Sequence, residues 1–335
     1  MSARPELNRR FTCAPMMDWS DRHCRYFWRL LSQRAVLYTE MVTTGALIYG
    51  DRERFLAFDP AEQPVALQLG GSDPQALARC AQFAQQWGYN EVNLNCGCPS
   101  DRVQSGRIGA CLMAEPELVR DCMSAMSERV DLPVTIKHRI GIDDMDDYDG
   151  LMRFVDTVAE SGCRTFIVHA RKAWLQGLSP KENRDIPPLD YTLVARLKRE
   201  RPELEIIVNG GIVTMEQCQR LLDEVDGVML GREIYANPYL LATVDQTLYG
   251  DPAPPPSRAQ VMAQFMNYCE RELSKGTKLN QLTRHILGLY QGLPGARRFR
   301  REISENAHKK GAGIEVLEKA LSQLGGEARA LPDPQ

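Results

Sequence analysis

A cysteine in the segment EVNLNCGCPSDRV (residues 91–103) is the side chain of this sequence best placed to react. Residues 91–95 alternate between apolar and polar side chains, as a half-buried strand does, and Gly97 and Pro99 then break the pattern. Cys98 therefore follows a strand directly, where α/β enzymes carry reactive groups. A thiol packed in a tight turn would explain the same residue, because free cysteine is most often a small core side chain.

Two kinds of chemistry are open to Cys98. A cysteine thiol is mostly protonated near neutral pH, so it can deliver a proton as an acid without help. To act as a nucleophile it would need a nearby cation that stabilises the thiolate, and Arg102 is the close candidate in the sequence. Cys96 lies only two residues away, but the preceding glycine and following proline belong to Cys98, so we interpret Cys96 as a packing residue.

Other short apolar runs also end in polar groups and glycines. Glycines after late strands let backbone N–H groups approach a phosphate closely. Each position alone is explained as a turn glycine or a buried side chain, but together, at the same end of successive strands, they predict one shared site. The residues are Pro15, Met16, Met17, Gln68, Lys137, His169, Asn209, Gly210, Gly211, Gly231 and Arg232.

The elements that would position these residues alternate along the chain. We expect strands at 11–16, 36–42, 64–71, 91–97, 134–141, 165–172, 204–211 and 227–233. Helices are expected at 21–31, 73–87, 115–129, 147–161, 190–199, 214–223 and 238–248. Eight apolar strands separated by helices predict an α/β fold, and they favour a (β/α)8 TIM barrel over an open Rossmann sheet. The absence of a GxGxxG motif after the first strand also weakens the Rossmann alternative.

The strand pattern stops at the proline-rich segment DPAPPPS (251–257), which we interpret as a stiff linker. The sequence thus predicts a barrel domain over 1–250 and a small helical bundle over 258–330, with helices near 258–274, 278–290, 296–309 and 313–324. Charge divides at the same place. Residues 1–256 carry 28 Lys and Arg against 36 Asp and Glu, whereas residues 257–330 carry 13 against 7.

The bundle also contains the basic run RRFRR (297–301), and such clusters attract polyanions. A solvated helix face is the competing explanation, because Glu302 and Glu305 lie close by.

The overall composition narrows the class of protein. With 335 residues, 43% of them hydrophobic, and a net charge of -3, the chain is an ordinary soluble protein whose total charge implies no partner. Its ten cysteines form no CxxC pair, so we expect reduced thiols in a cytoplasm and no metal centre. No stretch approaches the roughly 18 uninterrupted apolar residues that a membrane span needs, so we expect no membrane association. No protein partner is implied.

Taken together, the motifs resemble those of the tRNA-dihydrouridine synthases, and most closely the A-type bacterial branch. The resemblance runs from Phe11 to about Leu324. It implies an FMN enzyme, a barrel followed by a helical bundle, that uses NADPH to reduce uridine in the tRNA D-loop at positions 20 and 20a. The motifs are APMMDWSDRHCR (14–25), YTEMV (38–42), QLGGSDP (68–74), NLNCGCPSDRVQSGRIGACLM (93–113), KHRIGIDD (137–144), HARKAWLQGLSPKENRDIPPLDY (169–191), NGGI (209–212), GREIYANP (231–238) and HILGLYQGLPGARRFRREISENAH (285–308).

The same resemblance assigns roles to individual residues. Hydride would pass from N5 of FMN to C6 of the uracil, and Cys98 would give a proton to C5. We hypothesise that Lys137 stabilises the reduced flavin, and a structural ion pair would also explain this lysine. FMN contacts are implied for Pro15, Met16, Met17, Gln68, Lys137, His169, Asn209, Gly210, Gly211, Gly231 and Arg232. Contacts to tRNA are implied for Asn95, Lys181, Arg184, Arg298 and Arg301.

Two other classes of protein remain open from the residues. An FMN oxidoreductase acting on a free small molecule would account for the barrel but not for the basic bundle. An RNA-binding module on a degenerate barrel would account for the bundle but not for Cys98, Lys137 and His169.

Overall fold

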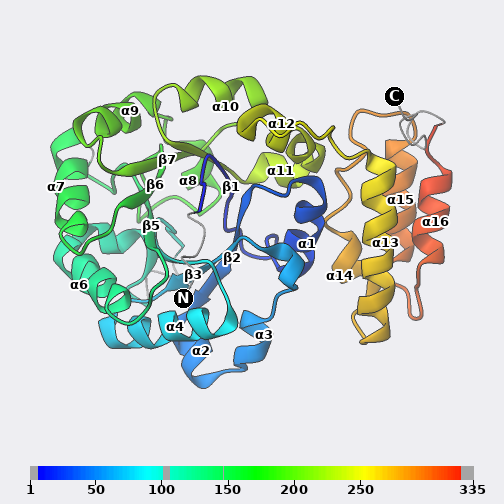
Figure 1. The fold of residues 1–335 in the computed structure, drawn as a ribbon, viewed down its shortest axis with the longest axis horizontal. Helices are drawn as coiled ribbons and strands as arrows, with labels where there is room; N and C mark the ends of the chain where they lie inside the picture. Colours follow the sequence, from blue (N-terminus) through cyan, green and yellow to red (C-terminus); the bar gives the residue numbers. More distant parts are fainter. Residues whose placement is uncertain (1–6, 101–105, 146, 326–335) are drawn as a thin grey trace. The chain divides into compact units, whose positions relative to one another are not determined.

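The eight strands close into a barrel in which every strand runs parallel to its neighbours, in the order β1 to β8 (Figure 1). The computed structural model describes residues 7–100, 106–145 and 147–325. The predicted (β/α)8 barrel is confirmed. The strands are β1 (Phe11–Cys13), β2 (Val36–Thr43), β3 (Val65–Gly70), β4 (Glu91–Cys96), β5 (Val134–Arg139), β6 (Thr165–His169), β7 (Glu205–Asn209) and β8 (Gly227–Leu230).

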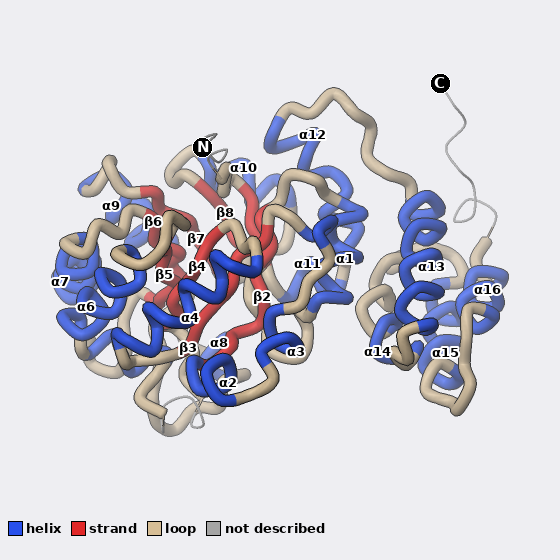
Figure 2. The backbone as a smooth tube through the Cα atoms, turned by 60° about the horizontal axis from the view of Figure 1, so that its bottom comes forward, coloured by secondary structure: helices blue, strands red, loops and turns tan. Residues whose placement is uncertain are grey.

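Helices surround the ring of strands, as Figure 2 shows in blue around red. The outer ones are α4 (Pro74–Trp87), α6 (Pro116–Ser127), α7 (Tyr148–Ala159), α9 (Tyr191–Glu200) and α10 (Met215–Leu222). Most begin where a short polar side chain accepts a backbone N–H of the first turn, which satisfies a donor that the helix itself leaves unpaired. These capping residues are Asp73, Asp147, Asp190 and Thr214.

Several short elements were not predicted, because each spans too few residues to show a periodic pattern. They are α2 (Thr44–Tyr49), α3 (Arg52–Leu56), η1 (Pro60–Glu62), η2 (Gly109–Ala114), α8 (Glu182–Asp185) and α11 (Arg232–Ala236). The helix expected at 238–248 is a 3-10 turn, η3 (Pro238–Thr243), followed by α12 (Val244–Tyr249).

The described residues form two compact units. The first contains residues up to Asp18 together with Val36–Gly231, and it holds the whole barrel. The second contains Trp19–Ala35 and the chain from Arg232 onward. Helix α1 (Arg22–Leu31) and residues 232–249 therefore pack with the C-terminal helices. The proline run at 251–257 is thus not where the two compact units divide. The functional division into domains 1–250 and 258–330 stays a prediction.

The C-terminal helices are α13 (Arg258–Ser274), α14 (Leu279–Thr283), α15 (Ala296–Asn306) and α16 (Glu315–Ser322). The helix predicted over 278–290 is wrong beyond Thr283, where turns replace it. Glycine is a poor helix former, and at Gly288 the backbone comes so close to the Ala236 carbonyl that an added Cβ would lie 2.1 Å from its oxygen. That close approach accounts for a glycine in an otherwise helical pattern.

Buried charges close the barrel at the end where the strands begin. Arg9 donates to Glu91 at 2.6 Å and to Glu205 at 2.8 Å, and the Tyr38 hydroxyl donates to Glu91 at 2.6 Å. The next layer is apolar, and it includes Ala66 and Ile207. Because these groups fill the start of the barrel, the polar side chains at the other ends of the strands are left for function, as is usual in this fold.

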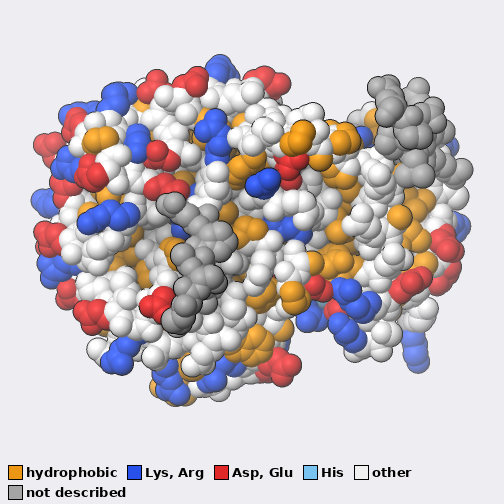
Figure 3. Space-filling model, in the orientation of Figure 1, with side chains coloured by type: hydrophobic (Ala, Val, Ile, Leu, Met, Phe, Trp, Pro, Cys, Tyr) orange, Lys and Arg blue, Asp and Glu red, His pale blue; other side chains and the backbone are white. Residues whose placement is uncertain are grey.

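No helix in the described part of the chain is long and apolar enough to cross a membrane. The outer surface of the barrel carries Lys and Arg side chains interspersed with Asp and Glu (Figure 3).

Candidate functional site

The strand pairing brings the predicted residues of five neighbouring strands, β3 to β7, to one end of the barrel. Asn95 of β4 pairs with Lys137 of β5, and His169 of β6 pairs with Asn209 of β7. Gln68 of β3 pairs with Asn93 of β4. Parallel strands in register place such residues side by side, so a site spread over 140 residues of sequence becomes a single surface.

A chain of side-chain amides runs across the first of these strands. The Gln68 amide donates to Asn93 Oδ1 at 2.8 Å and accepts from Asn95 Nδ2 at 2.8 Å. Asn95 Oδ1 in turn accepts the backbone N–H groups of Gly97 at 3.1 Å and Cys98 at 3.0 Å. Both ends of the Asn95 amide are therefore engaged, and the loop that carries Cys98 is tied to the strands beneath it.

The two neighbouring cysteines differ in environment. Cys96 ends β4 and is fully buried, and that burial raises the pKa of its thiol well above the usual range. Cys98 is half-buried, with its Sγ 3.7 Å from Ser100 Oγ. This difference agrees with the interpretation of Cys96 as packing and leaves Cys98 as the thiol a substrate can reach. Arg102, the candidate for stabilising a thiolate, lies outside the described residues.

Lys137 donates from Nζ to Asn209 Oδ1 at 2.9 Å, and Asn209 Nδ2 donates to the Met229 carbonyl at 2.8 Å. Burial, with the like charge of Arg139, lowers the pKa of Lys137 to about 7. The ammonium is thus held in a fixed direction, and its charge changes near neutral pH. Such a group can stabilise negative charge that develops on a neighbouring ring.

Arg139 is a buried residue that sequence reasoning missed. Its Nε donates to the Gly97 carbonyl at 2.9 Å, and its NH1 group donates to the carbonyls of Lys172 and Asn183, both at 3.0 Å. Burial lowers the pKa of Arg139 to about 10, and the like charges of Arg184 and Arg171 act in the same direction. The sequence KHR (137–139) does place Arg139 two residues after Lys137. Residues two apart on a strand point to the same face, so Arg139 could have been placed on the face of Lys137.

The glycines after β7 form a cradle that only glycine permits. Gly210 and Gly211 have φ values of 115° and 67°, which disfavour any side chain. A Cβ at Gly210 would lie 2.6 Å from His169 Cδ2, and one at Gly211 would lie 2.4 Å from Leu189 Cδ1. Gly210 is buried and Gly211 is exposed, and glycine backbone at the end of a late barrel strand allows the close approach that a phosphate needs.

The remaining predicted cofactor residues follow strands β1 and β8. Pro15 and Met16 are half-buried, whereas Met17 is 56% exposed. A Cβ at Gly231 would lie 3.2 Å from the Met16 sulfur, so the two loops meet. Arg232, which is exposed, begins α11 directly after Gly231.

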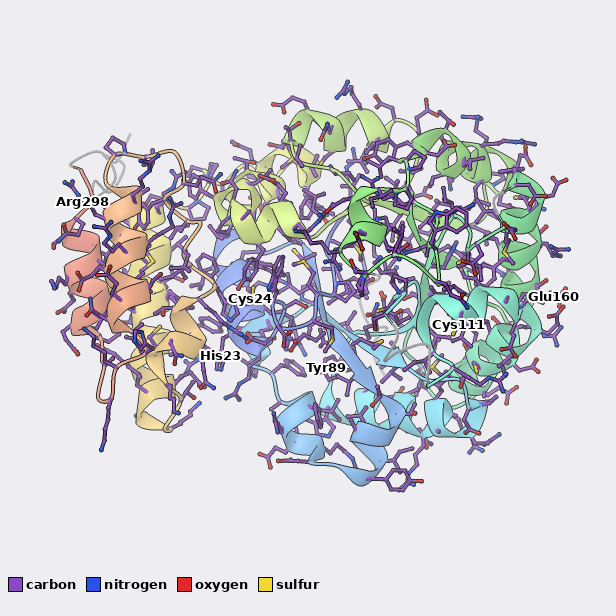
Figure 4. The ribbon with its side chains drawn as sticks, turned by 180° about the vertical axis from the view of Figure 1, so that it is seen from behind. His23, Cys24, Tyr89, Cys111, Glu160 and Arg298 are labelled. Carbon is purple, nitrogen blue, oxygen red and sulfur yellow. The ribbon has the colours of Figure 1, made fainter. Side chains whose placement is uncertain are left out.

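The predicted tRNA contacts fall on two separate parts of the chain. Lys181 is exposed and directly precedes α8, and Arg184 is half-buried within that helix. Arg298 and Arg301 are exposed on α15, and Figure 4 labels Arg298 on that helix. Arg298 donates to the Gln323 carbonyl at 3.2 Å and, with Arg297 and Arg300, lines a hollow of about 610 Å³. Arg301 lies 3.8 Å from Glu305.

Among the residues that the structure describes, no three His, Cys, Asp or Glu side chains are grouped so that they could hold a metal ion.

Comparison with known proteins gives a consistent set of relatives. Residues 12–324 match the family described as Dihydrouridine synthase. A protein of Vibrio cholerae named tRNA-dihydrouridine(20/20a) synthase is 61% identical over 316 residues, which cover 94% of this chain and 96% of that protein. A Pseudomonas putida protein of the same name is 58% identical over 325 residues, 97% of each chain.

More distant solved structures share the fold. A 2-naphthoyl-CoA reductase with 2-naphthoyl-CoA aligns with a TM-score of 0.53 and 13% identity, over 75% of this chain and 51% of that one. A morphinone reductase variant in complex with tetrahydroNAD aligns with a TM-score of 0.51 and 13% identity, over 75% of this chain and 90% of that one.

Proposed function

Because this chain belongs to the dihydrouridine synthase family, we propose that it reduces uridine to 5,6-dihydrouridine in the D-loop of tRNA, with bound FMN and with NADPH as reductant. Positions 20 and 20a of the tRNA are the proposed targets, since they appear in the names of its relatives. The observation that carries the proposal is the arrangement at the strand ends, where a half-buried Cys98 is held by Asn95, which pairs with Lys137.

FMN, when bound, would supply the hydride that adds to C6 of the uracil. Gly210, Gly211, Gly231 and Arg232 would hold its phosphate, because they offer backbone without side chains and an exposed cation after β7 and β8. Pro15, Met16, Met17, Gln68, His169 and Asn209 would contact the remainder of the cofactor. Lys137 would place its positive charge beside the ring and favour the electron-rich reduced state.

Cys98 would deliver the proton that C5 of the uracil needs after hydride addition. The backbone of Cys98 is held through Asn95, which would restrict where the thiol lies before substrate arrives. The uracil must be unstacked and inserted into the barrel mouth, since a cofactor held among strand ends cannot reach a base inside a folded tRNA. The basic residues Lys181, Arg184, Arg298 and Arg301 would hold the tRNA body through its phosphates.

A direct assay tests this function. The purified protein should carry flavin absorbance and should form dihydrouridine in an unmodified tRNA transcript when NADPH is added. Free uridine at the same concentration serves as the matched control substrate. Turnover of free uridine comparable to that of tRNA would instead support a small-molecule oxidoreductase, and protein that binds tRNA but never flavin would support an RNA-binding module.

A further inference from the structure

We propose that Trp174, with Lys172 against its ring, is a platform on which an unpaired base of the tRNA D-loop next to the reactive uridine stacks. This inference rests on the proposed function and extends it to a residue that contacts the neighbouring nucleotide. The reactive uracil itself would lie at Cys98, so the platform serves its flanking base.

The Trp174 side chain is partly exposed. Large aromatic side chains are mostly buried, yet Trp174 is 38% exposed in the loop after β6. The Lys172 ammonium lies 4.1 Å from the centroid of its ring. An indole beside a cation matches the chemistry of a nucleotide, because the ring stacks on a base and the ammonium attracts the phosphate.

The backbone of Trp174 is held in place by a buried asparagine. Asn183 is fully buried, its Oδ1 accepts the Trp174 N–H at 2.8 Å, and its Nδ2 donates to the Trp174 carbonyl at 2.8 Å. The loop after β5 adds support on the other side. Asp143 accepts the N–H of Leu175 at 2.8 Å through its side chain, and its own N–H donates to the Ala173 carbonyl at 2.8 Å. An exposed ring on so firmly held a backbone suits a binding surface better than a mobile loop tip.

The platform lies beside the reactive cysteine because Arg139 joins the two loops. One guanidinium donates to the carbonyl of Gly97, next to Cys98, and to the carbonyls of Lys172 and Asn183, at 2.9 to 3.0 Å. The carbonyls on either side are therefore bridged by one guanidinium and its hydrogen bonds. A nucleotide adjoining a uracil at Cys98 falls within the span of this bridge.

The chain offers a matched control for Trp174. Trp87 is 36% exposed and ends helix α4, which leads back to the start of β4, so it lies at the opposite end of the barrel from the strand-end site. Loss of exposed indole area is therefore similar in Trp174→Leu and Trp87→Leu, and only the first removes the platform.

The test uses flavin-loaded full-length protein and unmodified tRNA transcript. For Trp174→Leu we expect the tRNA Kd and the KM to rise about 5- to 100-fold, the range that a lost base-stacking contact gives. The kcat at saturating tRNA should change much less, and Trp174→Phe should recover part of the affinity. Flavin content and NADPH oxidation without tRNA should match the wild type, and Trp87→Leu should behave as wild type throughout.

Tryptophan fluorescence at tRNA concentrations that saturate both proteins provides a second readout. Adding tRNA should quench the emission of the wild type, and the quenching should be largely lost in Trp174→Phe. Equal quenching in both proteins, or a tRNA affinity of Trp174→Leu equal to wild type, would overturn the platform while leaving the proposed function intact. A wild type that forms no dihydrouridine would overturn the proposed function itself.

Discussion

Asn95 accepts the backbone N–H of Cys98 at 3.0 Å, so the residue implied as a substrate contact also holds the backbone that carries the proposed acid. Its Nδ2 is engaged with Gln68 at 2.8 Å, which fixes the amide orientation. The backbone of Cys98 is therefore tied to a chain of amides that begins on the neighbouring strand, β3.

Replacing Asn95 should accordingly slow the reaction without removing any reacting group. Asn95→Ala leaves the N–H groups of Gly97 and Cys98 without their acceptor, and misplacement of a reacting group by about 1 Å can cost on the order of 100-fold in rate. Asn95→Asp keeps the acceptor and should retain more activity. Single-turnover formation of dihydrouridine measures both. Equal rates for the two variants would show that the acceptor does not matter.

Cys98→Ala should still bind FMN and accept electrons from NADPH, yet form dihydrouridine about 10²- to 10⁴-fold more slowly, which is the typical contribution of a positioned acid. Cys96→Ala is the control, because Cys96 is fully buried at the end of β4. It should react nearly as the wild type does. Exchanged phenotypes would place the acid at Cys96.

Lys137 should leave a signature in the dependence of stability on pH. Burial and Arg139 lower the pKa of this lysine from 10.5 to about 7, so between these values the unfolded chain binds more protons than the folded one. This group therefore makes the cofactor-free protein more stable as pH rises through that window. In Lys137→Met this contribution to the free energy of unfolding should be absent.

Denaturant unfolding of the cofactor-free wild type and Lys137→Met from pH 6 to 10 measures the two free energies of unfolding. The test is how each free energy changes with pH. A constant difference between the two proteins is expected in any case, because the variant also loses the bond to Asn209. The same variant should retain FMN less well or be reduced more slowly by NADPH. Parallel stability curves would mean that Lys137 keeps an ordinary pKa in the folded protein.

The bundle arginines should govern the salt dependence of tRNA binding. Each phosphate contact removed should lower the slope of log K against log[salt] by roughly 0.7 to 1. Arg298→Glu with Arg301→Glu should therefore weaken tRNA binding strongly, while flavin content and NADPH oxidation by the free enzyme stay normal. Arg199→Glu, an exposed arginine of α9 in the barrel, is the control. If plots of log K against log[salt] had the same slope and intercept for the double variant and the wild type, these arginines would only form a solvated helix face.

The sequence predicted the barrel because each strand is a short apolar run between recognisable helix caps. The third strand, expected at 64–71, is Val65–Gly70, and the helix expected at 73–87 begins one residue after its cap Asp73. Such elements can be predicted because residues close together in the sequence determine them. The helix expected at 278–290 was wrong because a distant contact, that of Gly288 with Ala236, decides its conformation.

For the same reason the sequence indicates some candidate site residues and not others, and the roles of all of them stay predictions. Cys98 and the glycines after β7 were recognisable, because a turn interrupts a strand there. Arg139 and Trp174 were not, since the hydrogen bonds of Arg139 join segments that follow different strands of the barrel and Trp174 is held by Asn183, which also follows β6. Arg139 meets a carbonyl 42 residues earlier, at Gly97, and no pattern in the sequence indicates that contact.

The central claim is that Cys98 completes reduction of a D-loop uridine in tRNA. The most direct measurement is a site-resolved map of dihydrouridine in tRNA from cells that lack this gene and from the same cells supplied with wild type, Cys98→Ala or Cys96→Ala. We predict that dihydrouridine disappears at positions 20 and 20a, returns with wild type and Cys96→Ala, and stays absent with Cys98→Ala. Undiminished dihydrouridine at both positions without the gene, or full restoration by Cys98→Ala, would contradict the claim.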